Sequence, residues 1–214
     1  MNSESPSGSE PAASIASDPY RYVAPDPWGG VRAAGFSIRF VARFVDMIAR
    51  TVVSGTAGML FGLVFAAMHP ERVHELSNPE QQSTASLYLT GLVASVVYHA
   101  VTESFGGASL GKLVCGLRVT TPTLGRATFR GAVVRNLAFF IDSLFFGLVA
   151  YSSMSKSDKQ LRYGDRWGGT VVVHAEGAPD AARRTGGELA LWVLVGLGFE
   201  AALVFVTMLL HHST

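Results

Sequence analysis

A cluster of charged residues lies within an apolar stretch near the start of the chain. Its members are spaced by 4, 3 and 4 residues and are Arg39, Arg43, Asp46 and Arg50. At the angular step of a helix, these positions fall within about 60° of one another. The carboxylate lies within pairing reach of an arginine on either side. Clusters of arginine and carboxylate can exchange protons or cations by changing partner and burial, which is chemistry suited to transport.

We expect this charged face to point into a helix bundle and not into lipid. Small residues continue the stripe, and Gly58 and Gly62 form a GxxxG pair beside it, which permits close approach of helices. A charge at mid-bilayer costs at least about 2.5 kcal/mol, so we predict a buried pair between Arg39 and Asp46. For the other two arginines, a role as topology anchors or lipid-headgroup binders is an equally good interpretation.

A second stretch repeats the pattern R-x-x-A-x-F-[VI]-D. It runs from Arg135 to Asp142. Asn136, next to Arg135 within this stretch, adds a neutral hydrogen-bonding group. One interpretation is two equivalent helices around a shared polar centre, as in transporters built from repeats. The other is a chance echo, because apolar letters recur easily in membrane helices.

Two more charged residues are candidates for supporting roles. Glu200 lies near the centre of the last apolar stretch, and an intramembrane carboxylate is a functional candidate by default. We expect it to face a neighbouring helix or its symmetry mate in an oligomer, with His99 and Glu103 as potential counterparts. Lys112 follows a glycine-rich turn, where we expect it to face headgroups or a carboxylate.

The glycine-rich turn does not predict an enzyme. It is nearly a phosphate-binding loop, but Leu113 stands where a Ser or Thr would hold magnesium. The sequence "GASLG" mimics a nucleophile elbow without the required strand–turn–helix context. The pair His99 and Glu103 is too small for a metal site. We therefore expect no enzymatic activity, no metal and no cofactor.

The composition indicates a membrane protein. Of 214 residues, 49% are hydrophobic and only 15% are charged, whereas soluble domains carry about a quarter charged residues. The net charge of +1 gives no reason to expect a nucleic-acid partner. Apolar segments cover residues 38–68, 86–102, 128–154 and 189–210. A spanning helix needs about 20 apolar residues, so the first and fourth fit and the second is marginal.

The third apolar segment is ambiguous. Lysine and arginine gather in the links 103–131 and 153–187, whereas the link 68–85 is acidic. Four simple spans would put the two cationic links on opposite faces, against the rule that positive charge collects in the cytoplasm. The β-branched runs 116–121 and 169–174 have the composition of strands. If they pair on one face, the segment between them must leave and return on that face.

We therefore predict an all-α membrane protein with three spanning helices and a re-entrant or interfacial helical hairpin. The hairpin turns near Asp142–Ser143 or Gly147, and a small two-stranded β element lies in the cytoplasm. Four full spans are the alternative, with segment 128–154 as the third.

Three sequence blocks resemble a known family. They are "GFSIRFVARFVDMI" (35–48), "GASLGKLVCGLRV" (107–119) and "LRYGDRWGGTVVV" (161–173), and they resemble the RDD family of bacterial membrane proteins. That family is named for an arginine and two aspartates, which Arg39 and Asp46 match in the first helix. Asp165 matches the second aspartate, with Asp142 as its rival. The resemblance covers about residues 35–175 and implies a multi-pass protein, often suggested to transport small ligands or ions.

The domain organisation follows from these segments. We expect a disordered cytoplasmic tail and linker (1–34), an RDD-like membrane domain (35–175), a linker (176–187) and an additional transmembrane helix (188–211).

The site is expected to combine Arg39, Asp46, Asp142 and Asp165. The chain would then be a small-ligand or ion transporter, or else a membrane adaptor whose charged pairs are structural. We expect it in the cell (inner or plasma) membrane with the N-terminus in the cytoplasm. The expected partners are lipid and further copies of the chain in a homo-oligomer, and no ligand is assigned.

Overall fold

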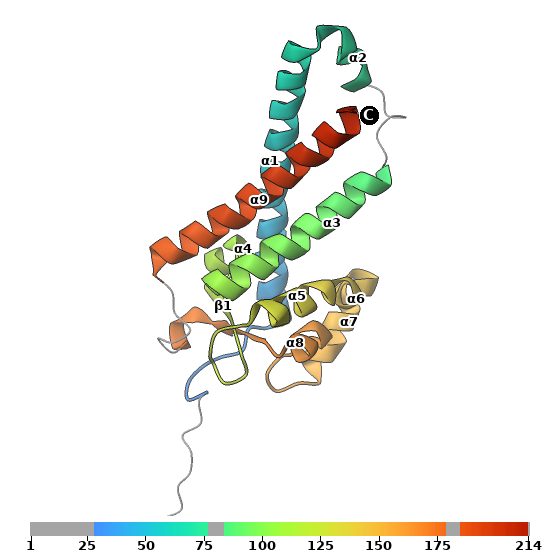
Figure 1. The fold of residues 1–214 in the computed structure, drawn as a ribbon. Helices are drawn as coiled ribbons and strands as arrows, with labels where there is room; N and C mark the ends of the chain where they lie inside the picture. Colours follow the sequence, from blue (N-terminus) through green and yellow to red (C-terminus); the bar gives the residue numbers. More distant parts are fainter. Residues whose placement is uncertain (1–27, 77–83, 179–184, 214) are drawn as a thin grey trace, which may run out of the picture.

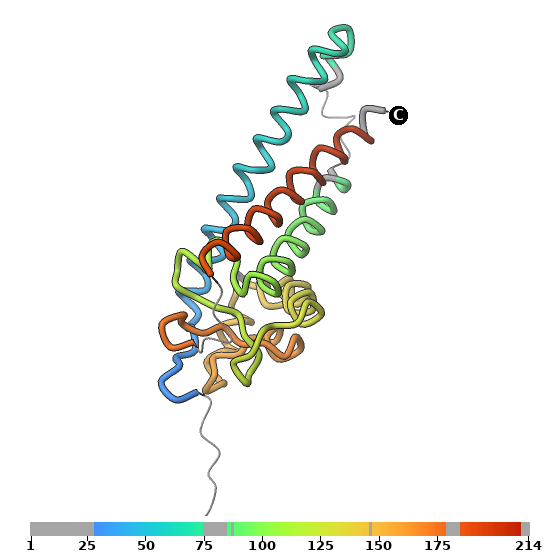
Figure 2. Tube along the Cα trace, turned by 60° about the vertical axis from the view of Figure 1, so that its left-hand side comes forward, coloured from blue at the N-terminus to red at the C-terminus, as the bar shows by residue number. Residues whose placement is uncertain are grey.

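Three long helices pack side by side in the computed structural model, which describes residues 28–76, 84–178 and 185–213. They are α1 (Phe36–Met68), α3 (Thr84–Val101) and α9 (Gly186–Ser213). α1 runs away from the end that holds the shorter elements, α3 runs back towards it, and α9 runs away again (Figures 1 and 2). The predicted tail at 1–34 falls mostly outside the described residues and stays a prediction.

Two of these helices meet the length and apolarity needed to cross a membrane. They are α1, with 33 residues, and the stretch Gly186–Leu210 of α9, with 25. Large apolar side chains such as Leu63 and Leu194 are more than 60% exposed on them, as expected of surfaces that face lipid. α3 has 18 residues and is about 27 Å long, slightly short of the hydrocarbon thickness of about 30 Å. It is the segment that the sequence analysis predicted to be marginal.

The third apolar segment folds into short helices at one end of the bundle. These are α5 (Phe129–Leu137), α6 (Phe139–Asp142) and α7 (Leu144–Ser155). The chain bends by 110° between Phe129–Asp142 and Gly147–Ser155. Gly147 has a φ of +86° there, a conformation that glycine adopts without strain. The bend lies where the hairpin was predicted to turn. α5, α6 and α7 lie at the sheet end of the bundle, where α5 packs against α3 (Figure 1).

The two predicted strands are confirmed. β1 (Leu117–Thr120) and β2 (Val171–His174) pair antiparallel, with Leu117 opposite His174. The residues before α1 extend this sheet, since the backbone N–H of Ala34 donates to the carbonyl of Val172 at 2.9 Å. β1 precedes the α5–α7 hairpin in the sequence and β2 follows it. Because the two strands pair, both ends of the hairpin lie on one face of the molecule.

The remaining elements are short. At the far end lie η1 (Pro70–Arg72) and α2 (Val73–Leu76); at the sheet end lie a π-helical turn η2 (Thr102–Gly106), α4 (Leu110–Val114), α8 (Tyr163–Gly168) and η3 (Ala175–Gly177). The described parts of the cationic links therefore lie at the sheet end, and the described part of the acidic link lies at the opposite end (Figure 2).

Glycine permits the close docking of α4 on α1. A Cβ atom built on Gly111 would lie 1.8 Å from the carbonyl oxygen of Ala42, a distance no packing adjustment of side chains can relieve. The same residue donates its backbone N–H to Asp46 at 2.8 Å. The approach of α4 therefore fixes the position of a predicted site residue.

We predict that Gly111→Ala destabilises the protein by about 1–3 kcal/mol, because the new methyl group forces α4 away from α1. Thermal unfolding in detergent micelles measures the effect. Gly62→Ala is the control, since nothing lies within 4 Å of its added Cβ and alanine favours the helix. Equal melting temperatures for Gly111→Ala and the wild type would contradict the docking argument.

Candidate functional site

Asp165 joins three separate parts of the chain. Its Oδ2 accepts from Nη1 of Arg39 at 2.5 Å, and its Oδ1 lies 3.2 Å from Nη2 of Arg135. These partners lie on α1 and α5, whereas the carboxylate lies in α8, where it also caps the helix by accepting from the backbone N–H of Arg162 at 3.3 Å. Asp165 therefore contacts a cation from each of two helices, Arg39 of α1 and Arg135 of α5.

The environment of Asp165 keeps it ionised. The side chain is fully buried, and burial alone would raise its pKa. The guanidinium groups of Arg135 and Arg39 outweigh burial and hold the pKa of this carboxyl well below its usual range. Two arginines around one buried carboxylate thus make a charge-compensated joint between α1, α5 and α8.

Glu103 forms the second centre of the site, which sequence reasoning did not recognise as such. Its carboxylate accepts hydrogen bonds from Nζ of Lys112 at 2.6 Å and from Nδ2 of Asn136 at 3.2 Å. Nη1 of Arg135 lies 3.5 Å from the same group, so Arg135 connects Glu103 to Asp165. The only sequence signal was an acid directly after a marginal apolar segment.

Lys112 faces a carboxylate, one of the two surroundings predicted for it. Burial lowers the pKa of its ammonium group, and the Glu103 carboxylate opposes that change without cancelling it. α4, which carries Lys112, therefore brings a buried cation to Glu103 as well as a backbone donor to Asp46.

The predicted pair between Arg39 and Asp46 is wrong. Asp46 is buried, but it accepts from the hydroxyl groups of Tyr98 and Ser109, at 3.0 and 2.6 Å, and from the N–H of Gly111. Helical side chains lean towards the N-terminus of their helix. Arg39 therefore points away from a residue two turns later and reaches Asp165. Among the described residues, no arginine lies within ion-pair distance of Asp46.

Glu200 was predicted to face either a neighbouring helix or its symmetry mate in an oligomer, and in the structure it contacts a neighbouring helix. Its carboxylate accepts from Nε of Arg50 at 2.7 Å and from the hydroxyl of Ser54 at 3.0 Å. The pair lies inside the bundle and ties α9 to α1. The proposed counterparts His99 and Glu103 are not its partners, because they lie 3.6 Å from each other at the sheet end.

Asp142 lies at the edge of the cluster. It accepts from the N–H of Gly164 at 3.2 Å, and Nε of Arg162 lies 3.9 Å from it and 3.7 Å from Asp165. Asp142 does not pair with Arg135, its companion in the repeated sequence pattern. Of the four residues predicted to combine, Arg39 and Asp165 are in contact, Asp142 is linked through Arg162, and Asp46 is separate.

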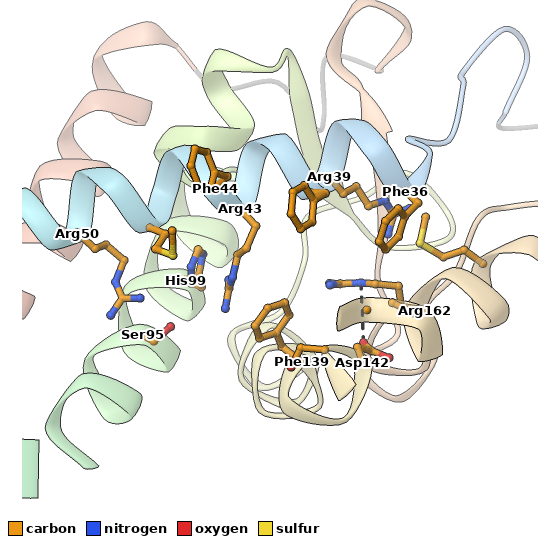
Figure 3. Close-up of a pocket in the computed structure, with 16 residues that line it drawn as sticks. Phe36, Arg39, Arg43, Phe44, Arg50, Ser95, His99, Phe139, Asp142 and Arg162 are labelled. Atoms are coloured by element: carbon orange, nitrogen blue, oxygen red, sulfur yellow. Dashed lines mark ion pairs between the residues drawn. The ribbon is translucent and has the colours of Figure 1, made fainter. Parts of the chain in front are cut away.

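A pocket of about 550 Å³ opens beside the cluster. It lies between α1, α3 and the α5–α7 hairpin, and Figure 3 shows Arg43 and Arg162 reaching into the space above Phe139 and Asp142. His99 also lines it. The two ring nitrogens of His99 have no hydrogen-bond partner in the described part of the chain, although Asp46 lies 4.0 Å and Glu103 3.6 Å away. The histidine therefore lies between the two carboxylate sites.

Fold and site together define a helical membrane protein whose buried carboxylates are matched by cations at one end of the bundle. The chain belongs to the RDD family, whose sequence profile matches residues 33–169. This confirms the resemblance, and it includes Arg39, Asp46, Asp142 and Asp165 while leaving α9 and Glu200 outside. No curated protein and no solved structure matches the chain.

We predict that Asp165→Asn destabilises the protein by about 3–5 kcal/mol, because it leaves two arginines without their buried counter-charge. The midpoint of thermal unfolding in micelles tests this. Asp158→Asn is the matched control, since it removes the same charge from an exposed position nearby. Equal midpoints for the two variants would mean that the joint does not hold the fold together.

The same residue gives a pH prediction. A carboxyl with a lowered folded pKa stabilises the protein fully above its unfolded pKa of about 3.9, and this contribution is lost as pH falls through the folded value. The stability difference between wild type and Asp165→Asn should therefore shrink below about pH 5. A difference that stays constant between about pH 7 and pH 3 would contradict the assigned ionisation.

Proposed function

We propose that this RDD-family protein is an ion or proton transporter that uses the buried polar cluster beside the pocket. The observation that supports the proposal is the position of His99. It lines the pocket, lacks a hydrogen-bond partner among the described residues, and has a carboxylate site on either side. A histidine that lines a pocket between two carboxylate sites suits a step of proton or cation exchange. The proposal assigns no enzymatic reaction.

The orientation belongs to the same proposal. Positive charge collects on the cytoplasmic side of membrane proteins, so the end with the sheet and α5–α8 is assigned to the cytoplasm. The N-terminus then lies in the cytoplasm and the C-terminal end of α9 lies outside. We assign the protein to the cell membrane, with the pocket near the cytoplasmic interface.

A second candidate function has an observation in its favour. Asp165 and Glu103 are matched by arginine, lysine and asparagine donors, an arrangement that suits a fixed structural joint. In this alternative the protein is a non-transporting adaptor, and the charged pairs hold the α5–α8 region against α1. Its cytoplasmic face would then bind a partner.

Flux measurements separate the two. Purified protein in proteoliposomes should carry H⁺, Na⁺ or K⁺, and Asp46→Asn should reduce that flux by at least about tenfold, because the asparagine amide can neither exchange a proton nor neutralise a cation. Asparagine can still accept from Gly111 and Tyr98, so the variant is expected to fold. Asp158→Asn serves as the control and should retain full flux.

The outcomes are distinct. Flux in wild type and control, with loss in a folded Asp46→Asn, supports transport through the cluster. Absence of flux for all three ions in correctly folded wild-type protein rejects the proposal and favours the adaptor. Equal flux in wild type and Asp46→Asn would show that ions cross by a route that avoids this cluster.

A further inference from the structure

The pocket has an excess of positive charge. Its lining residues include four arginines and one carboxylate, namely Arg39, Arg43, Arg50, Arg162 and Asp142. Buried arginines are normally compensated by an acid or by a ligand. The partner of each one therefore indicates whether a compensating group is missing.

Three of these arginines have acidic partners within the protein. Arg39 pairs with Asp165 and Arg50 with Glu200, at 2.5 and 2.7 Å, and Arg162 lies within 4.0 Å of two aspartates. Arg43 has none among the described residues. Its one hydrogen bond there is a long one, 3.5 Å, to Oδ1 of Asn136. Its guanidinium lies 4.0 Å over the ring of Phe139.

Arg43 therefore has donors to spare. A guanidinium has five N–H donors arranged in a fork that fits a phosphate or carboxylate group. The side chain is half-buried, so the cation is partly removed from solvent, and no described carboxylate is in ion-pair contact with it. An anionic group in the pocket would supply that counter-charge, and Figure 3 shows that Arg43 projects into the space where it would lie.

The rest of the lining is apolar. Phe36, Phe40, Phe44 and Met47 from α1 and Met154 from α7 contribute to the wall, and Phe40, Phe44 and Met47 are at least half exposed on the outer surface of α1. The pocket thus continues onto a surface suited to hydrocarbon. A volume of about 550 Å³ is that of a site for a drug-sized ligand.

We propose that this pocket binds an anionic lipid, with the headgroup phosphate or carboxylate on Arg43 and the hydrocarbon along Phe40, Phe44 and Met47. Arg43 lies about two turns into α1, close to the end that carries the sheet, so it lies at the depth of headgroups when α1 spans the bilayer. Basic pockets between membrane helices bind anionic headgroups at this depth. The proposal rests on the pocket alone, so it stands whether or not the protein transports ions.

The test uses full-length protein purified in a neutral detergent. Phosphatidylglycerol should raise its melting temperature, and native mass spectrometry should detect retained lipid. Phosphatidylcholine and inorganic phosphate should produce neither effect, because one lacks the net charge and the other the hydrocarbon. Arg43→Gln should weaken phosphatidylglycerol binding about tenfold or more. Arg130→Gln is the control, since it removes an exposed arginine outside the pocket.

A second variant keeps the test decisive if Arg43→Gln fails to fold. Ser95→Phe retains every charge and places a ring in the pocket that Ser95 lines, and it should abolish the phosphatidylglycerol effect. Equal stabilisation by phosphatidylcholine, or equal affinity in Arg43→Gln and Arg130→Gln, would overturn the proposal. Stabilisation by inorganic phosphate alone that is lost in Arg43→Gln would replace the lipid by a soluble anion and also overturn it.

Discussion

The structure depends on the matching of buried carboxylates with cations at one end of the bundle. Asp165 holds Arg39 and Arg135 together, and Arg135 continues to Glu103. An isolated charge in this environment would cost several kcal/mol, whereas a paired and hydrogen-bonded charge is tolerated. In the series Arg39, Asp165, Arg135 and Glu103, each charged group therefore restricts the position of the next one. The linked elements are α1, η2, α5 and α8.

The sequence predicted the elements of this end better than it predicted their contacts. The apolar lengths, the β-branched runs and the uneven distribution of lysine and arginine each follow from local composition. They indicated the long helices, the paired strands and the position of the bend near Gly147. The family resemblance placed Asp165 in one site with Arg39, and these two residues form an ion pair.

The partners within the cluster could not be predicted from spacing. Arg39 and Asp46 share a helix face, but a face specifies a direction around the axis and not how far each side chain leans along it. The central role of Glu103 could not be predicted from the sequence for another reason. Its burial depends on the π-helical turn η2 and on the docking of α4 through Gly111, and both are tertiary features. Three neutral donors around Asp46 likewise come from α3 and α4, which lie more than 50 residues away in the sequence.

Some ionisable groups at the sheet end have close partners of opposite charge, and others do not. The first kind stabilises the fold, whereas the second kind is available to a ligand or a proton. Asp165 and Glu103 are surrounded by donors, so exchange at either requires breaking a joint between helices. Arg43 and His99 differ, because both line the pocket and neither has a close acidic hydrogen-bond partner among the described residues. They lie on α1 and α3, and both line the same pocket. An anion at Arg43 would therefore change the field at His99, so occupancy of the pocket and protonation of the histidine are coupled by simple electrostatics.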